Sequence, residues 1–137
     1  MKNQRIAVFD FNANDCDYTA EAIGAYYKGQ GLEMPEITTW TEDLPFRLHV
    51  MDMADRNAHY DMMFIGADTM KGADVAHMIR IIDKGCPLFL VSSSVELAVE
   101  GFRLQALDYL TKPASSMRVG EAIARINTVY TKGGDET

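Results

Sequence analysis

The chain contains little cysteine, a minority of basic residues and no long apolar run. Its only two cysteines, Cys16 and Cys86, have neither metal-ligand spacing nor a disulfide framework, so we expect two reduced thiols. Lys and Arg number 13 against 20 Asp and Glu, and the net charge is −7. Direct nucleic-acid binding needs a basic surface and is therefore not expected. Without a membrane-length apolar stretch or a signal peptide, the sequence predicts a cytoplasmic protein with no membrane contact.

What the chain does contain is a regular alternation of short apolar runs and helical patterns. Its 137 residues suit one domain. Strands are expected at 6–9, 36–40, 62–65, 88–91 and 108–111. Helical spacing covers about 20–27, 43–59, 73–82, 95–104 and 116–130. A βα unit repeated five times predicts an α/β fold with a doubly wound, parallel, five-stranded sheet.

Polar side chains follow four of the five expected strands. Asp10 follows the first strand, a loop at 66–68 the third, Ser92 the fourth and Lys112 the fifth. The carboxyl ends of parallel strands meet at one edge of a sheet, where open α/β folds bind their ligands. We therefore expect these residues to lie close together.

Two stretches of the chain carry a resemblance to a known family. They are Pro87-Leu-Phe-Leu-Val-Ser-Ser-Ser and Ala106-Leu-Asp-Tyr-Leu-Thr-Lys-Pro113. Over essentially its whole length the chain resembles the receiver domains of response regulators, in particular those that precede LytTR-type DNA-binding domains. The resemblance implies a flavodoxin-like (βα)5 fold with strand order 2-1-3-4-5. It also implies a receiver or pseudo-receiver domain at 1–131, a flexible tail at 132–137, and a two-component signalling module that is not an enzyme.

The resemblance also implies a phosphoryl-transfer site, which this chain matches in part. Such a site has two adjacent acids that hold Mg²⁺, an acceptor aspartate that ends the third strand, a hydroxyl after the fourth and a lysine after the fifth. Asp10 matches the first acid and is at most a weak metal ligand, whereas Phe11 stands where the second is needed. Ser92 matches the hydroxyl, and Lys112, followed by Pro113, matches the lysine.

The acceptor position falls on Gly66, which cannot be phosphorylated. Asp68 is the alternative acceptor and metal ligand, but choosing it makes the loop to the next helix about four residues short of the family pattern, against about two with Gly66. We therefore expect a degenerate, phosphorylation-independent receiver that acts through protein–protein contacts. No cofactor is expected, and Mg²⁺ only if Asp68 is the acceptor.

Each of these residues also has a purely structural interpretation. Lys112 and Asp10 can form a buried ion pair that anchors two strand ends. Ser92 can cap the following helix, and Ser93 is one of its competitors for that place. Asp68 can be a solvated loop acid.

The resemblance further implies protein partners and a switch residue. The partners are a sensor kinase or an effector domain, and a homodimer through the fourth and fifth helices is a further expectation. Tyr109, on the fifth strand, is the expected switch residue or a dimer anchor. A flavodoxin-like nucleotide- or flavin-binding protein remains as another alternative, although the loop at 11–17 is too acidic to cradle a phosphate.

Overall fold

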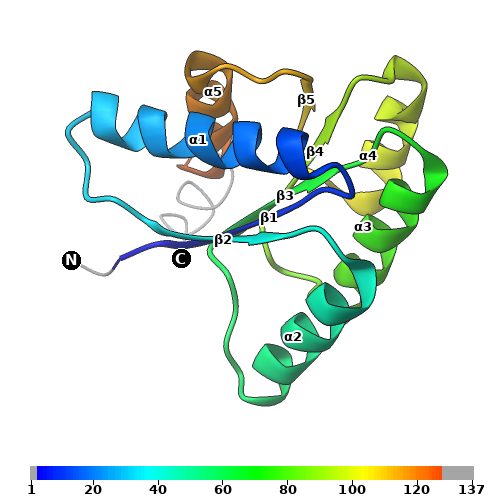
Figure 1. The fold of residues 1–137 in the computed structure, drawn as a ribbon. Helices are drawn as coiled ribbons and strands as arrows, with labels where there is room; N and C mark the ends of the chain where they lie inside the picture. Colours follow the sequence, from blue (N-terminus) through cyan, green and yellow to red (C-terminus); the bar gives the residue numbers. More distant parts are fainter. Residues whose placement is uncertain (1–2, 128–137) are drawn as a thin grey trace.

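The computed structural model describes residues 3–127, which form a parallel five-stranded sheet between two layers of helices (Figure 1). The sheet has the order β2-β1-β3-β4-β5, and every neighbouring pair is parallel. The strands are β1 (Arg5–Phe9), β2 (Glu36–Trp40), β3 (Met62–Gly66), β4 (Leu88–Ser92) and β5 (Asp108–Thr111). The expected α/β flavodoxin-like fold and its strand order are confirmed.

The helices divide between the two faces of the sheet (Figure 1). One face is covered by α1 (Ala13–Gly29) and α5 (Ser116–Ile126). The other is covered by α2 (Asp43–Asp55), α3 (Met70–Ile82) and α4 (Ala98–Leu104), which the 3₁₀ turn η1 (Val95–Leu97) precedes. Within residues 3–127, no helix is long and apolar enough to cross a membrane.

Side-chain alternation along the strands builds two separate cores. On β1, Ile6 and Val8 pack toward α1 and α5, whereas Ala7 and Phe9 pack toward α2 and α3. This follows from the two-residue period of a strand. Both β3 and β4 are buried at every position, as their unbroken apolar runs predict. The two cores hold the strand ends in place. The polar residues of the expected site follow these strand ends.

Cys16 and Cys86 are both free and buried, in agreement with the expectation of two reduced thiols. The Cys16 thiol lies 3.6 Å from the carbonyl oxygen of Val8. Burial raises the pKa of both thiols, so both are held in the neutral form. Neither cysteine has the exposed, electropositive surroundings of a reactive thiol.

Helix ends depart from the sequence-based expectation at several places. The first helix begins at Ala13 and not near residue 20, because Asn12 caps it through the Asp15 N–H, and residues 95–97 form a 3₁₀ turn before α4. The second helix ends at Asp55 and not near His59, because Asn57 takes a left-handed conformation (φ 57°) that turns the chain. The third helix begins at Met70, three residues before the expected start. Gly72 makes this early start feasible, since a Cβ there would lie 2.6 Å from the Gly66 carbonyl oxygen. The expected helical stretch at 128–130 and the tail at 132–137 lie outside the described residues.

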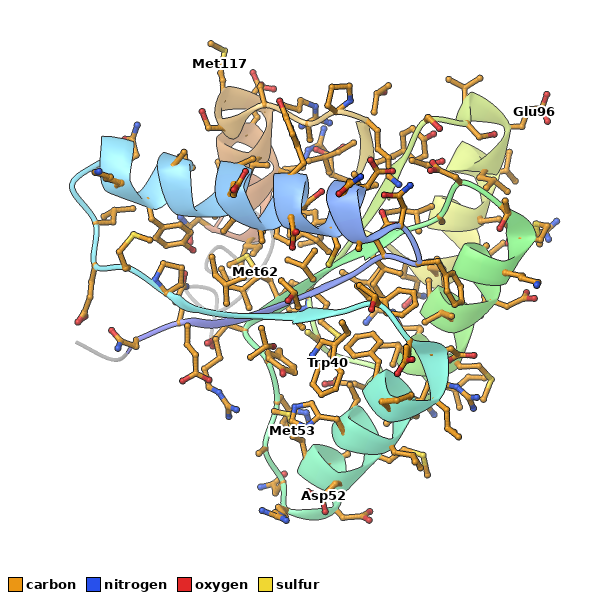
Figure 2. The ribbon with its side chains drawn as sticks, in the orientation of Figure 1. Trp40, Asp52, Met53, Met62, Glu96 and Met117 are labelled. Carbon is orange, nitrogen blue, oxygen red and sulfur yellow. The ribbon has the colours of Figure 1, made fainter. Side chains whose placement is uncertain are left out.

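The edge strand β2 is joined to α2 by an aromatic cluster. The Trp40 ring stacks on the His49 ring, with centroids 4.8 Å apart, and lies between the sheet and α2 (Figure 2). The Nε2 of His49 is 2.9 Å from the Tyr60 hydroxyl, which is 2.8 Å from the Thr38 hydroxyl. This chain of contacts fixes α2 against the edge of the sheet.

Candidate functional site

The ammonium group of Lys112 is surrounded by three carboxylates at the carboxyl edge of the sheet. Its Nζ lies 2.6 Å from Oδ2 of Asp10, 2.9 Å from Oδ2 of Asp15 and 2.9 Å from Oδ2 of Asp68. The side chain of Lys112 is only 9% exposed. Burial alone would lower the pKa of Lys112, but the hydrogen bonds to these carboxylates raise it above its ordinary value. The lysine therefore stays charged.

Asp10 is held in place on both sides of its carboxylate. Its backbone N–H donates to the Trp40 carbonyl at 3.0 Å, which continues the pairing of β1 with β2. Its Oδ1 accepts a hydrogen bond from the backbone N–H of Asn12 at 2.9 Å, and its Oδ2 faces Lys112. The expected placement of Asp10 beside Lys112 is what the structure has, and the pair is buried.

Gly66 is the last residue of β3, and it lies against Asp10. A Cβ on Gly66 would be 2.0 Å from Oδ2 of Asp10 and 2.4 Å from its Cγ. No real Cβ comes so close to another heavy atom, so any side chain at 66 would displace the carboxylate. The Asp10 carboxylate thus fills the space in which a side chain at the end of β3 would begin.

Asp68 is tied to two neighbouring loops and is not a freely solvated acid. Its Oδ1 accepts from the backbone N–H of Ser93 at 2.8 Å and from the Ser93 hydroxyl at 2.9 Å, while its Oδ2 accepts from Lys112. Its side chain is still 36% exposed. Partial burial alone would raise the pKa of Asp68, but the Ser93 N–H and the hydrogen bonds from Lys112 and Ser93 together lower it.

Ser92 is fully buried and shapes the turn that follows β4. Its hydroxyl oxygen accepts from the backbone N–H of Ser94 at 2.9 Å, which closes a local turn before η1 and does not cap the following helix. Its contact with Oδ1 of Asp68 is long, at 3.4 Å. The closer hydroxyl to Asp68 is that of Ser93, which sequence reasoning treated only as a competing cap.

Asp15 is the other residue of the site that sequence reasoning missed. It lies in the first turn of α1, and its backbone N–H donates to the side chain of the capping residue Asn12 at 3.0 Å. This turn aims the Asp15 carboxylate at Lys112. The available signal was an acid in the first turn of a helix that starts at the same sheet edge as Asp10.

The residues of this edge, as they are arranged, do not fit a magnesium ion. Phe11, at the position of the second acid, is 46% exposed and packs edge-on against Phe9 with ring centroids 5.0 Å apart. The Lys112 ammonium stands at the point where the three carboxylates meet. Among residues 3–127, no group of three or more His, Cys, Asp or Glu side chains is arranged to hold a metal.

Tyr109 and Pro113 complete the set of expected site residues. The half-buried Tyr109 packs against the core on the α3 and α4 side, and its hydroxyl donates to the Ser94 carbonyl. Its own carbonyl accepts from Arg118 of α5 at 3.1 Å. The exposed Pro113 follows Lys112 through a cis peptide bond. Tyr109 therefore contacts the turn after β4, whereas Pro113 only adjoins the lysine.

The space beside Lys112 is small. A cavity of about 190 Å³ is lined there by Asp15, Tyr18, Thr19 and their neighbours on α1. Pockets for nucleotide-sized ligands typically measure about 300–1,000 Å³, so this cavity gives no support to the flavin alternative. A cavity of about 380 Å³ lies at the opposite, amino edge of the sheet, far from the acidic cluster, and is lined in part by Gln4.

Sequence comparison finds partial similarity to known transcriptional regulatory proteins. No protein-family model matches the chain. The transcriptional regulatory protein CusR of Escherichia coli K12 is 30% identical, over 61% of this chain and 41% of CusR. The chain thus spans about two fifths of the length of this curated relative.

Solved structures show the same fold at lower identity. A CheY-like response regulator receiver domain protein from Methanospirillum hungatei JF-1 has a TM-score of 0.72 and 15% identity, covering 96% of this chain and 99% of that one. The REC domain of AraT, a response regulator from Geobacillus stearothermophilus, has a TM-score of 0.72 and 17% identity, covering 97% and 99%. The chain therefore has the CheY-like receiver fold.

Proposed function

We propose that this chain is a degenerate receiver module of a two-component system, which signals through protein contacts without phosphorylation of an aspartate at the end of β3. The observation that carries the proposal is the pair formed by Gly66 and Asp10. The residue that ends β3 has no side chain, and the space for one is filled by the Asp10 carboxylate. A phosphoryl group cannot be attached to glycine.

The arrangement of charges around Lys112 further supports this proposal. Its ammonium already contacts the carboxylates of Asp10, Asp15 and Asp68. An incoming phosphoryl group would meet three negative charges and one positive charge that is fully engaged, which is unfavourable in a partly buried site. We therefore propose that no magnesium ion takes part in the function.

The proposed partners are a sensor kinase or an effector domain, and the resemblance favours a LytTR-type DNA-binding domain as the effector. The proposed contact surface is the one formed by α4, β5 and α5, where a second copy of the chain is the simplest partner (Figure 1). Val95 is 72% exposed, and Val99 and Met117 are exposed as well.

Light scattering should show that the chain forms a dimer. The double change Val95→Ser and Val99→Ser should weaken this dimer, while Leu32→Ser, at an exposed site elsewhere, should leave it unchanged. A monomer at every concentration would reject the dimer.

One observation favours a second candidate, a working acceptor at Asp68. Its carboxylate lies within hydrogen-bond distance of both Lys112 and Ser93, which are the kinds of donor that a phosphoryl group needs. Against it, both carboxylate oxygens are already engaged by these donors. The degenerate receiver remains the better supported function.

Incubation with a small acyl phosphate and Mg²⁺, followed by intact-mass measurement, separates the two candidates. We expect no added mass on the wild-type chain or on the Asp68→Asn variant. Added phosphate on the wild type that is lost in Asp68→Asn would establish Asp68 as the acceptor and reject the degenerate receiver. The same measurement on Asp74→Asn, an exposed aspartate of α3, controls for surface modification.

A further inference from the structure

Hydrogen-bond donors from two loops converge on the carboxylate of Asp68, which lies in a third. Oδ1 accepts from the Ser93 N–H at 2.8 Å, from the Ser93 hydroxyl at 2.9 Å and from the Ser92 hydroxyl at 3.4 Å. Oδ2 accepts from Lys112 at 2.9 Å. A backbone N–H, hydroxyls and an ammonium aimed at one point are the donors with which proteins bind oxyanions such as carboxylate and phosphate.

We infer that Ser92, Ser93 and Lys112 form an oxyanion-binding site whose ligand is the carboxylate of Asp68 in the same chain. The inference rests on the proposed function, because it requires that this edge of the sheet carry no phosphoryl group. Ser92 is fully buried and the Lys112 side chain is 9% exposed, so the fold holds these two residues in place, whereas Ser93 is exposed and is positioned by the turn after β4. The chain thereby supplies its own permanent anion.

The internal ligand also fixes the position of Tyr109. Asp68 holds Ser93, and the turn closes on itself through the bond from the Ser94 N–H to the Ser92 hydroxyl. On the other side of this turn, the Ser94 carbonyl accepts from the Tyr109 hydroxyl. Tyr109 is therefore held against the core by contacts that begin at Asp68 and need no added ligand. The proposed α4–β5–α5 contact surface would then be kept in one state.

The need to neutralise the Lys112 ammonium does not explain why Asp68 makes these contacts. Asp10 and Asp15 also contact the ammonium, so the lysine keeps two counter-ions without Asp68. Only Asp68 contacts the turn at 92–94 as well. This difference makes Asp15→Asn a matched control, because it also removes one counter-ion of Lys112 but leaves the turn untouched.

The test is an NMR comparison of wild type, Asp68→Ala and Asp15→Asn, without Mg²⁺ or any phosphodonor. In Asp68→Ala we expect shifts of the Ser93 amide and of the Tyr109 ring resonances, which Asp15→Asn does not produce. Inorganic phosphate should then bind Asp68→Ala with a saturable shift of the Ser93 amide. Its Kd should be at least about tenfold below that of wild type, because the internal carboxylate no longer competes.

Three results would overturn the inference: an unchanged Ser93 amide and Tyr109 ring in Asp68→Ala, equal shifts in Asp15→Asn, or phosphate binding no tighter than in wild type. If Asp68→Ala does not fold, Asp68→Asn carries the test, since it keeps the shape and loses the charge. It should shift the Ser93 amide and, at high phosphate, bind the anion better than wild type does. Mass gain after incubation with an acyl phosphate tests only the proposed function. A failure of the proposed function can therefore be told apart from a failure of this inference.

Discussion

Asp10 and Gly66 share a single space at the carboxyl edge of the sheet, in which the carboxylate of one takes the place of a side chain on the other. The distance of 2.0 Å between Oδ2 of Asp10 and a Cβ built on Gly66 makes the two positions interdependent. The lack of a side chain at the end of β3 and the position of the Asp10 carboxylate are therefore one structural fact. Restoring an acid at 66 alone would force Asp10 to move.

A double-mutant cycle at these two positions should reveal their coupling. Gly66→Ala should lower the free energy of unfolding by roughly 1–3 kcal/mol, because its methyl group overpacks the site. In an Asp10→Ala background the same change should cost less, with a coupling energy of about 0.5–3 kcal/mol. Urea unfolding of the four proteins measures this. Additive effects would mean that the carboxylate moves aside freely.

Removal of the Lys112 ammonium should be strongly destabilising. Lys112→Met leaves three carboxylates without their cation, and the loss of one partner of a buried ion pair costs roughly 3–5 kcal/mol. The deficit should shrink at acidic pH, where protonation relieves the repulsion among the carboxylates. Chemical unfolding at neutral and acidic pH measures both effects. Lys71→Met, at an exposed position of α3, should change stability by no more than about 0.5 kcal/mol.

The pKa of Asp68 gives the stability of the protein a defined acid dependence. Because this pKa is lower in the folded chain than its ordinary value of 3.8, Asp68 stabilises the fold above that value. The contribution is lost as the pH falls through the folded-state pKa. Asp68→Asn should therefore lose less stability than wild type over the same acid range, most clearly at low salt, since the group is partly exposed. Parallel acid-dependence curves for the two proteins would contradict this prediction.

The close approach of α3 to the end of β3 should tolerate no side chain at Gly72. A Cβ there would lie 2.6 Å from the Gly66 carbonyl oxygen and 2.7 Å from the Cα of Ala67. Both are backbone atoms that cannot rotate away, so Gly72→Ala should lower the free energy of unfolding by about 1–3 kcal/mol despite the better helix propensity of alanine. Gly85→Ala is the matched control, since nothing lies within 4 Å of its added Cβ. Equal thermal stability of the two variants would contradict the prediction.

The strands were predictable from the sequence because burial on both faces demands apolar residues at every position. β3 and β4 satisfy this demand, and β2 could be placed at the sheet edge from its short β-branched run. The ends of several helices were not predictable. The left-handed Asn57 ends one helix early, and the bare backbone of Gly72 lets another begin early. Both depend on local backbone geometry that apolar periodicity does not encode.

One part of the site could be predicted from the sequence, namely the residues whose positions are determined by the strand topology alone. Asp10 and Lys112 stand directly after parallel strands, so their meeting follows from the sheet. Asp15 lies in the first turn of α1, and Ser93 lies one residue after β4. Where their side chains point depends on the capping turn at Asn12 and on the turn after β4. The contacts of Asp68 with Ser93 depend on the turn after β4 and could not be predicted without it.

Trp40 is the only tryptophan of the chain, and its ring lies between the edge strand and α2, while its carbonyl receives the backbone N–H of Asp10. Intrinsic fluorescence excited at the indole therefore comes from a single place that adjoins both the α2 interface and the acidic edge. The undocking of α2 exposes this ring to water and changes its emission. Each unfolding measurement described above can thus be followed optically without an attached dye.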